Sequence, residues 1–103
     1  MQDQNDLTSA IELYKKIVII NPQYEEAHFN AGLLYLDLDS IQQAYQQFDL
    51  AVKVNPTFVQ GYFYRGVAAE FRGNVTQAKA DYQQALKLAP DYTQAQEALK
   101  QLQ

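Results

Sequence analysis

Apolar side chains recur along this chain at intervals of three and four residues, in segments separated by short polar turns. This spacing is typical of amphipathic α-helices. We therefore expect an all-α fold of about six helices. The predicted helices cover residues 7–20, 24–38, 41–54, 58–72, 75–88 and 92–102.

Polar residues, glycine and proline mark the ends of these predicted helices. Ser40 and Gln43 have the spacing of a capping box, and Asn74 is suited to cap the helix that follows it. Gly73 suits a turn residue with left-handed backbone geometry. Pro56 ends the helix before it, because the residue preceding a proline disfavours the helical conformation.

The helices repeat with a fixed period. The chain has three prolines, each 34 residues from the next, and an aromatic residue follows each proline by two positions. Alanine, aromatic and glycine positions recur with the same spacing: Pro22, Pro56 and Pro90; Tyr24, Phe58 and Tyr92; Ala10, Ala44 and Ala78; Tyr14, Phe48 and Tyr82; Gly32 and Gly66. A period of 20–50 residues indicates a repeat protein, in which each unit packs on its neighbours.

Within the period, the first full copy reads His28-x-x-Ala31-Gly32-x-x-Tyr35, then Ala44-x-x-x-Phe48, then Pro56. The second reads Tyr62-x-x-Arg65-Gly66-x-x-Ala69, then Ala78-x-x-x-Tyr82, then Pro90. This motif resembles the tetratricopeptide repeat, Trp-x-x-Leu-Gly-x-x-Tyr, Ala-x-x-x-Phe, Pro. Ala31 and Arg65 depart from it at the leucine position. The resemblance implies an α-solenoid of antiparallel helix pairs.

The resemblance divides the chain into four parts. Residues 1–22 correspond to the second helix of a truncated repeat, 23–56 and 57–90 to full repeats, and 91–103 to a C-terminal capping helix. Two full repeats fall short of the roughly three that such arrays usually need for stability. This indicates either a module of a larger scaffold or self-association.

Composition argues against several classes of function. The chain has no cysteine and one histidine, so thiolate chemistry is excluded and neither a Ser-His-Asp set nor a metal cluster is supported. His28 occupies a core motif position, where we expect a packing residue with one satisfied ring nitrogen. No glycine-rich phosphate loop is present. We therefore expect no enzyme, no cofactor and no metal.

The charge pattern bears on the partner. The net charge is −4, and the eight Lys and Arg residues are scattered, so we expect no nucleic-acid partner and favour basic or neutral proteins. No apolar run approaches the ~18 residues of a membrane span. The polar, acidic first six residues are unlike a signal peptide, which leaves the cytoplasm as the default location.

In the family that the motif resembles, the first helices of successive repeats line a concave groove. Here these helices would form an apolar, aromatic trough with an acidic and amide rim, lined by Glu26, Phe29, Asn30, Leu33, Phe63, Tyr64, Val67 and Phe71. We expect a partner peptide or helix to bury apolar side chains there, against Phe29, Phe63, Tyr64 and Phe71. The alternative is that Phe29, Phe63 and Val67 only pack between neighbouring helices.

Many family members bind the C-terminal carboxylate of chaperone tails through a set of Lys, Asn and Arg side chains. Of that pattern only Asn30 matches, because Gln60 and Tyr64 stand where the lysine and arginine are expected, and Arg65 lies one place away. We therefore expect no binding of an acidic chaperone tail.

The first predicted helix supports an alternative function. Ile17 and Ile19 occupy positions where the next copy has Ala51 and Lys53. A terminal repeat that tolerates variation would explain this. A homodimer through an exposed N-terminal helix would also explain it, with a contact formed by Ile11, Tyr14, Ile17 and Ile19.

Overall fold

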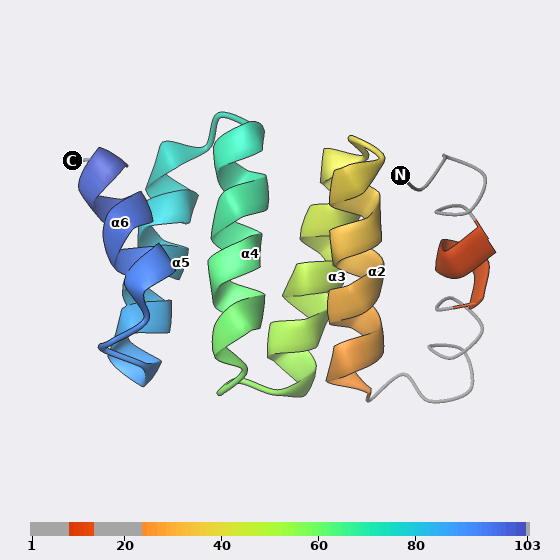
Figure 1. Ribbon diagram of the computed structural model, residues 1–103, viewed down its shortest axis with the longest axis horizontal. Helices are drawn as coiled ribbons and strands as arrows, with labels where there is room; N and C mark the ends of the chain where they lie inside the picture. Colours follow the sequence, from red (N-terminus) through yellow and green to blue (C-terminus); the bar gives the residue numbers. More distant parts are fainter. Residues whose placement is uncertain (1–8, 14–23, 103) are drawn as a thin grey trace.

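The computed structural model describes residues 9–13 and 24–102 of the chain. Within this part the protein is helical and contains no strand, as expected. Residues 9–13 form a short helical stretch. The complete helices are α2 (Glu25–Asp37), α3 (Ile41–Val54), α4 (Val59–Phe71), α5 (Val75–Leu88) and α6 (Thr93–Leu102) (Figure 1). Each lies within one residue of its predicted bounds.

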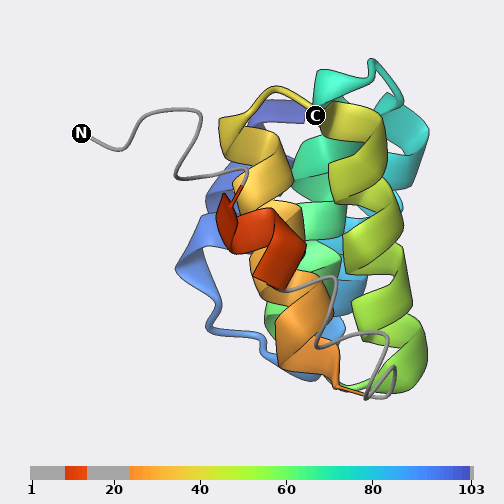
Figure 2. The same cartoon turned by 90° about the vertical axis from the view of Figure 1, so that its right-hand side faces the viewer.

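The helices stack as antiparallel neighbours in two layers. Along the chain, α2 packs on α3, α3 on α4, α4 on α5, and α5 on α6. In Figure 1, α2, α4 and α6 lie nearest the viewer with α3 and α5 behind them, and Figure 2 shows the stack from one end. The helices α2, α4 and α6 all run in the same direction, so their C-termini lie at one edge of the molecule (Figure 1). This arrangement is the expected α-solenoid.

A glycine in each repeat lets the paired helices approach closely. A Cβ atom placed on Gly32 would lie 2.5 Å from Cε1 of Phe48, and one on Gly66 would lie 2.7 Å from Cε1 of Tyr82. Both rings are almost completely buried. Glycine costs a helix roughly 1 kcal/mol relative to alanine. The close approach of the rings explains why glycine occupies both positions.

Small side chains and aromatic rings share the core. The alanines at the helix contacts are completely buried: Ala27, Ala44, Ala51, Ala68, Ala78, Ala85 and Ala95. One buried cluster surrounds Phe48, and a second surrounds Phe63 and Tyr82. Tyr45 and Tyr64 pack against both clusters, so the two repeats share one continuous core.

The turns inside the two repeats have the same backbone geometry. Gly73 has φ 79°, as predicted, and Asp39, at the equivalent position 34 residues earlier, has φ 58°. Aspartate is one of the few other residues that adopt this conformation readily.

The helix caps that follow these turns differ. The Asn74 side chain accepts a hydrogen bond from the Gln77 backbone N–H at 3.2 Å, which confirms the predicted cap. The capping box predicted at Ser40 is wrong, because the Ser40 side chain makes no cap hydrogen bond. The backbone N–H of Ser40 donates to the Tyr35 carbonyl at 2.8 Å, and that of Asn74 donates to the Ala69 carbonyl at 2.9 Å, so the backbone closes both turns in the same way.

Candidate protein-interaction surface

The eight residues predicted to line a groove lie on α2 and α4, and we call them the α2–α4 surface: Glu26, Phe29, Asn30, Leu33, Phe63, Tyr64, Val67 and Phe71. Their exposure differs widely. Glu26 and Phe71 are exposed, and Phe63 is buried with 8% of its surface accessible. The other five are half-buried.

Phe29 joins the two repeats through ring contacts. Its ring centroid lies 5.2 Å from that of Phe58 and 5.5 Å from that of Tyr64, both edge-on, and 5.9 Å from that of Phe48. Such tilted and edge-to-face contacts are the favoured geometries of aromatic pairs. Phe29 therefore links α2 to the α4 side of the core.

Phe63 packs with rings from three parts of the chain. Its centroid lies 5.0 Å from Tyr64, 5.5 Å from Tyr82 on α5, and 5.4 Å from Tyr92, which precedes α6. These are the contacts expected of a residue that packs between neighbouring helices. Phe63 therefore adds little accessible surface, and the accessible apolar part is carried by Phe29, Leu33, Tyr64, Val67 and Phe71.

Phe71 is the most exposed large apolar side chain in the described part of the chain. It is the last residue of α4, and 68% of its surface is accessible. Moving a phenylalanine side chain from water into a fully buried site is favourable by roughly 1.5–3 kcal/mol. Most of this free energy is not gained while Phe71 is exposed, so a contact that covered Phe71 would be favourable.

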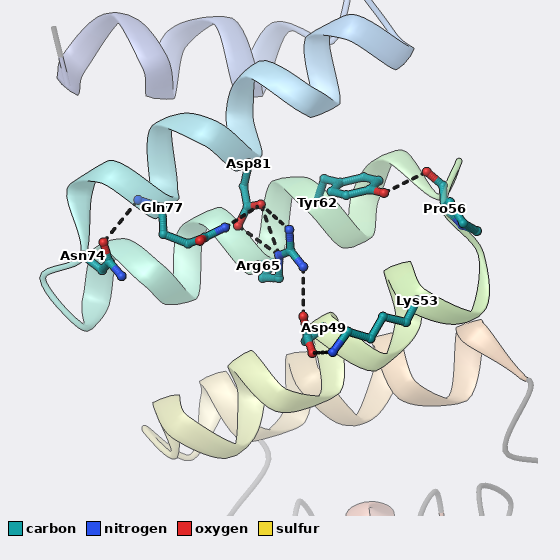
Figure 3. Close-up of polar contacts among 8 residues, drawn as sticks. All are labelled: Asp49, Lys53, Pro56, Tyr62, Arg65, Asn74, Gln77 and Asp81. Atoms are coloured by element: carbon teal, nitrogen blue, oxygen red, sulfur yellow. Dashed lines mark hydrogen bonds and ion pairs between the residues drawn. The ribbon is translucent and has the colours of Figure 1, made fainter.

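An ion network behind the α2–α4 surface joins three helices, and the sequence analysis did not identify it (Figure 3). Arg65 on α4 donates from Nε to both oxygens of Asp81 on α5, each at 3.1 Å, and from Nη2 to Oδ1 at 2.6 Å. Its Nη1 donates to Asp49 on α3 at 2.9 Å. Lys53 pairs with Asp49 at 2.7 Å, and Gln77 donates to Asp81 at 3.1 Å.

The Arg65–Asp81 pair lies mostly out of water, whereas the Lys53 side chain at the edge of the network is 69% exposed. The Asp81 side chain is 2% exposed and that of Arg65 is 16% exposed. Burial acts to lower the pKa of Arg65, but hydrogen bonds and the negative charge of Asp81 outweigh it, so the net pKa is raised and Arg65 stays charged. One signal in the sequence pointed to this network: Arg65 replaces a motif leucine, and a charge at a core position requires a partner.

In the preceding repeat, the residue equivalent to Asp81 is neutral and has a different hydrogen-bond partner. Gln47 lies 34 residues before Asp81, and its Oε1 lies 3.0 Å from Nδ1 of His28. His28 is 2% exposed, as expected for a core residue with a satisfied ring nitrogen. Within residues 9–13 and 24–102, no three His, Asp or Glu side chains gather in a way that could hold a metal ion.

The residues predicted for self-association fall mostly outside the described part of the chain. Tyr14, Ile17 and Ile19 lie outside it. Ile11 lies within it and is 4% exposed in a single copy, so it has almost no surface for a second copy to contact. None of the helices described is long and apolar enough to cross a bilayer.

Comparison with solved structures shows close similarity to known solenoid domains. The first TPR of Spaghetti (RPAP3), bound to the HSP90 peptide SRMEEVD, is 27% identical with a TM-score of 0.91, over 96% of this chain and 79% of that one. The Arabidopsis OM64 TPR domain is 28% identical with a TM-score of 0.90, over 96% and 82%. The first TPR domain of human RPAP3 is 27% identical with a TM-score of 0.90, over 96% and 78%.

Family models agree with these structures. The chain matches models described as TPR repeat over residues 3–39 and as Tetratricopeptide repeat over residues 25–58 and 59–92. Comparison with curated protein sequences gives no match. The repeat period, the glycine–ring contacts and the three family matches lead to one conclusion: the chain belongs to the tetratricopeptide repeat family.

Proposed function

We propose that this chain is a non-catalytic module that binds a peptide or helical segment of a partner protein on the α2–α4 surface, as one part of a larger scaffold. The observation that carries this proposal is the exposure of Phe71, 68%, on the same helix as the half-buried Tyr64 and Val67. The family and its fold, which are typically those of non-catalytic interaction modules, support it. A structure that is 27% identical holds a bound peptide.

In this mechanism the partner buries apolar side chains against Phe71, Tyr64 and Val67, with Leu33 contributing from α2. Tyrosine and other aromatic residues often dominate binding energy at interfaces. Phe29 and Phe63 have a supporting part, because both of their rings contact the Tyr64 ring edge-on. A preorganised surface of this kind lowers the entropy lost on binding.

The same geometry argues against an acidic chaperone tail as the partner. Arg65, the arginine next to the position where the family's clamp would place one, is fully engaged with Asp81 and Asp49. Tyr64 and Gln60 have uncharged phenol and amide groups in place of the cations of the clamp. Glu26 and Asp37, both exposed on α2, would repel a tail carboxylate. We therefore propose that the partner segment is not such a tail.

A displayed library of random twelve-residue peptides, selected on the whole chain, tests the module. Selected peptides should bind the unaltered chain, and Phe71→Ser should weaken binding by about tenfold or more, which corresponds to losing roughly 1.4 kcal/mol or more of apolar burial. Leu50→Ser is the matched control, since Leu50 is 40% exposed on α3 in the other layer. Failure to select any peptide, or equal binding by both variants, would overturn the proposal.

The chaperone-tail exclusion has its own test. The peptide SRMEEVD, which is bound in the first TPR of Spaghetti (RPAP3), should show no binding to this chain at millimolar concentration by calorimetry. Measurable binding would overturn the exclusion and leave the interaction module standing.

A further inference from the structure

Charged side chains divide between the two layers of the molecule. On α2, α4 and α6, the exposed carboxylates are Glu26, Asp37, Glu70 and Glu97. The described lysines of the other layer lie on α3 and α5: Lys53, Lys79 and Lys87. Counting every charged residue within these helices, α2, α4 and α6 hold five carboxylates and two cations, whereas α3 and α5 hold two carboxylates and three cations. The layer that carries the α2–α4 surface is therefore the more acidic of the two.

The cations of the first layer are turned away from the α2–α4 surface. Arg65 contacts Asp49 on α3 and Asp81 on α5. Arg72, which caps α4, lies over the Tyr45 ring of α3 at 5.1 Å. Lys100 of α6 is exposed and occupies the position equivalent to Gly32 and Gly66, which face rings of α3 and α5 in the other layer.

Asp37 stands where the helix itself disfavours a carboxylate. It is the last residue of α2, whose last turn carries no basic residue. The exposed carbonyl groups at a helix C-terminus bear partial negative charge, so a cation is favoured there and an anion is not. The Asp37 side chain makes no ion pair or hydrogen bond with the described residues. A cation from another molecule would relieve this repulsion.

Phe71 occupies the position on α4 that Asp37 occupies on α2, since the two residues are 34 apart. Both are exposed, and both end helices whose C-termini lie at the same edge of the molecule (Figure 1). This edge thus offers an aromatic ring, a carboxylate and two negative helix ends. An aromatic face and a carboxylate are both favourable partners for a lysine or arginine.

We propose that the partner segment recognised by the α2–α4 surface is cationic, with a lysine or arginine beside the apolar residue that contacts Phe71, and that Asp37 pairs with this cation. This inference rests on the proposed function, whose surface it refines. Acidic and neutral segments are the alternatives that the experiment separates. Such electrostatic complementarity acts mainly on specificity and on the rate of association.

The peptides selected from the random library provide the first test. Peptides whose binding depends on Phe71 should be enriched in lysine and arginine relative to the unselected library. Enrichment of Phe71-dependent peptides that are neutral or acidic would overturn the cationic partner and leave the proposed function intact. If no peptide depends on Phe71, both fail.

A charge reversal provides the second test. Asp37→Lys should weaken binding of the tightest selected peptide by about threefold to tenfold, because it replaces one exposed attraction by a repulsion. Asp91→Lys is the matched control, since Asp91 is exposed in the turn before α6 and the change in net charge is the same; it should alter binding by less than about twofold.

Loss of folding cannot explain such a result, because a lysine at the C-terminus of α2 is favoured by the helix dipole. Thermal unfolding of Asp37→Lys should therefore show a melting temperature at or above that of the unaltered chain. Unchanged peptide binding by Asp37→Lys would overturn the assignment of Asp37.

Discussion

The Arg65 guanidinium and the Asp81 carboxylate form a paired contact between α4 and α5, with both oxygens of Asp81 engaged by Nε and one also by Nη2. Asp81 is almost completely buried. A buried carboxylate is tolerated when a cation and hydrogen bonds satisfy it, and its cost appears when one partner is removed. Arg65 meets that requirement at a position where the family motif has leucine.

Arg65→Leu should therefore destabilise the fold although it restores the motif residue. We expect the free energy of unfolding to fall by about 3–5 kcal/mol, because Asp81 would remain buried without its cation. Urea denaturation followed by circular dichroism measures this change. The double variant Arg65→Leu, Asp81→Ala should recover most of the loss. A double variant as unstable as the single one would show that the charge of Asp81 is not the cause.

Gly32→Ala should destabilise the first full repeat. Alanine gains roughly 1 kcal/mol in helix propensity, but overpacking typically costs 1–3 kcal/mol. With the new Cβ 2.5 Å from a fully buried ring, the upper part of that range applies, and we expect a net loss of about 1–2 kcal/mol. Adding Phe48→Leu to Gly32→Ala should relieve the clash. A Gly32→Ala variant more stable than the parent would contradict the close approach.

Equivalent capping positions in the two repeats should respond differently to alanine. Asn74→Ala removes a side-chain cap and should cost about 1 kcal/mol. Ser40→Ala removes a side chain that makes no cap hydrogen bond, so it should cost less than half as much. Thermal or urea unfolding of the two variants gives the comparison directly, and equal losses would refute it.

Stability should decline at alkaline pH through Tyr82. Burial, followed by a hydrogen bond to Glu70 and the charges of Glu70 and Asp81, raises the pKa of Tyr82 above its ordinary value of 10.0. Above pH 10, Tyr82 ionises in the unfolded chain but stays neutral in the folded chain. The stabilisation that the buried neutral phenol contributes is therefore complete below pH 10 and is lost as the pH rises further. At pH 11 the loss relative to pH 9 should be about 1.4 kcal/mol.

The Tyr82→Phe variant isolates this effect, because phenylalanine is the residue at the equivalent position, Phe48. Its free energy of unfolding should fall less between pH 9 and pH 11 than that of the unaltered chain. Tyr92, whose pKa is raised by its burial and by Tyr64, remains in both proteins and contributes equally to both. Identical pH profiles would contradict the assignment to Tyr82.

The helix bounds were predictable because their signals are local. Residues 41–54 and 75–88 were bounded correctly by turn residues and by the end of each apolar pattern. The failure at Ser40 has no explanation in the turn before it. The turns before Ser40 and Asn74 both contain a residue with positive φ and close through the same backbone hydrogen bond, yet only the Asn74 side chain caps its helix.

The site was only partly predictable, because burial depends on distant neighbours. Phe63 and Phe71 lie on one helix and were both expected to contact a partner. Rings from residues 82 and 92 pack against Phe63, whereas Phe71 at the helix end is left exposed. The ion network escaped prediction for the same reason. Asp49 and Asp81 each lie 16 residues from Arg65, and only the packing of three helices brings them together.

The different partners of Gln47 and Asp81 have a consequence for folding. Repeats of nearly identical pattern can misassemble by exchanging helices between units. If α3 and α5 exchanged places here, Asp81 would lie opposite the helix of His28, and Arg65 would face the neutral Gln47. The buried Asp81 carboxylate would then lose its counterion. This penalty disfavours assemblies in which the helices pair in the wrong order. The His28–Gln47 and Arg65–Asp81 pairs therefore specify which helix packs on which.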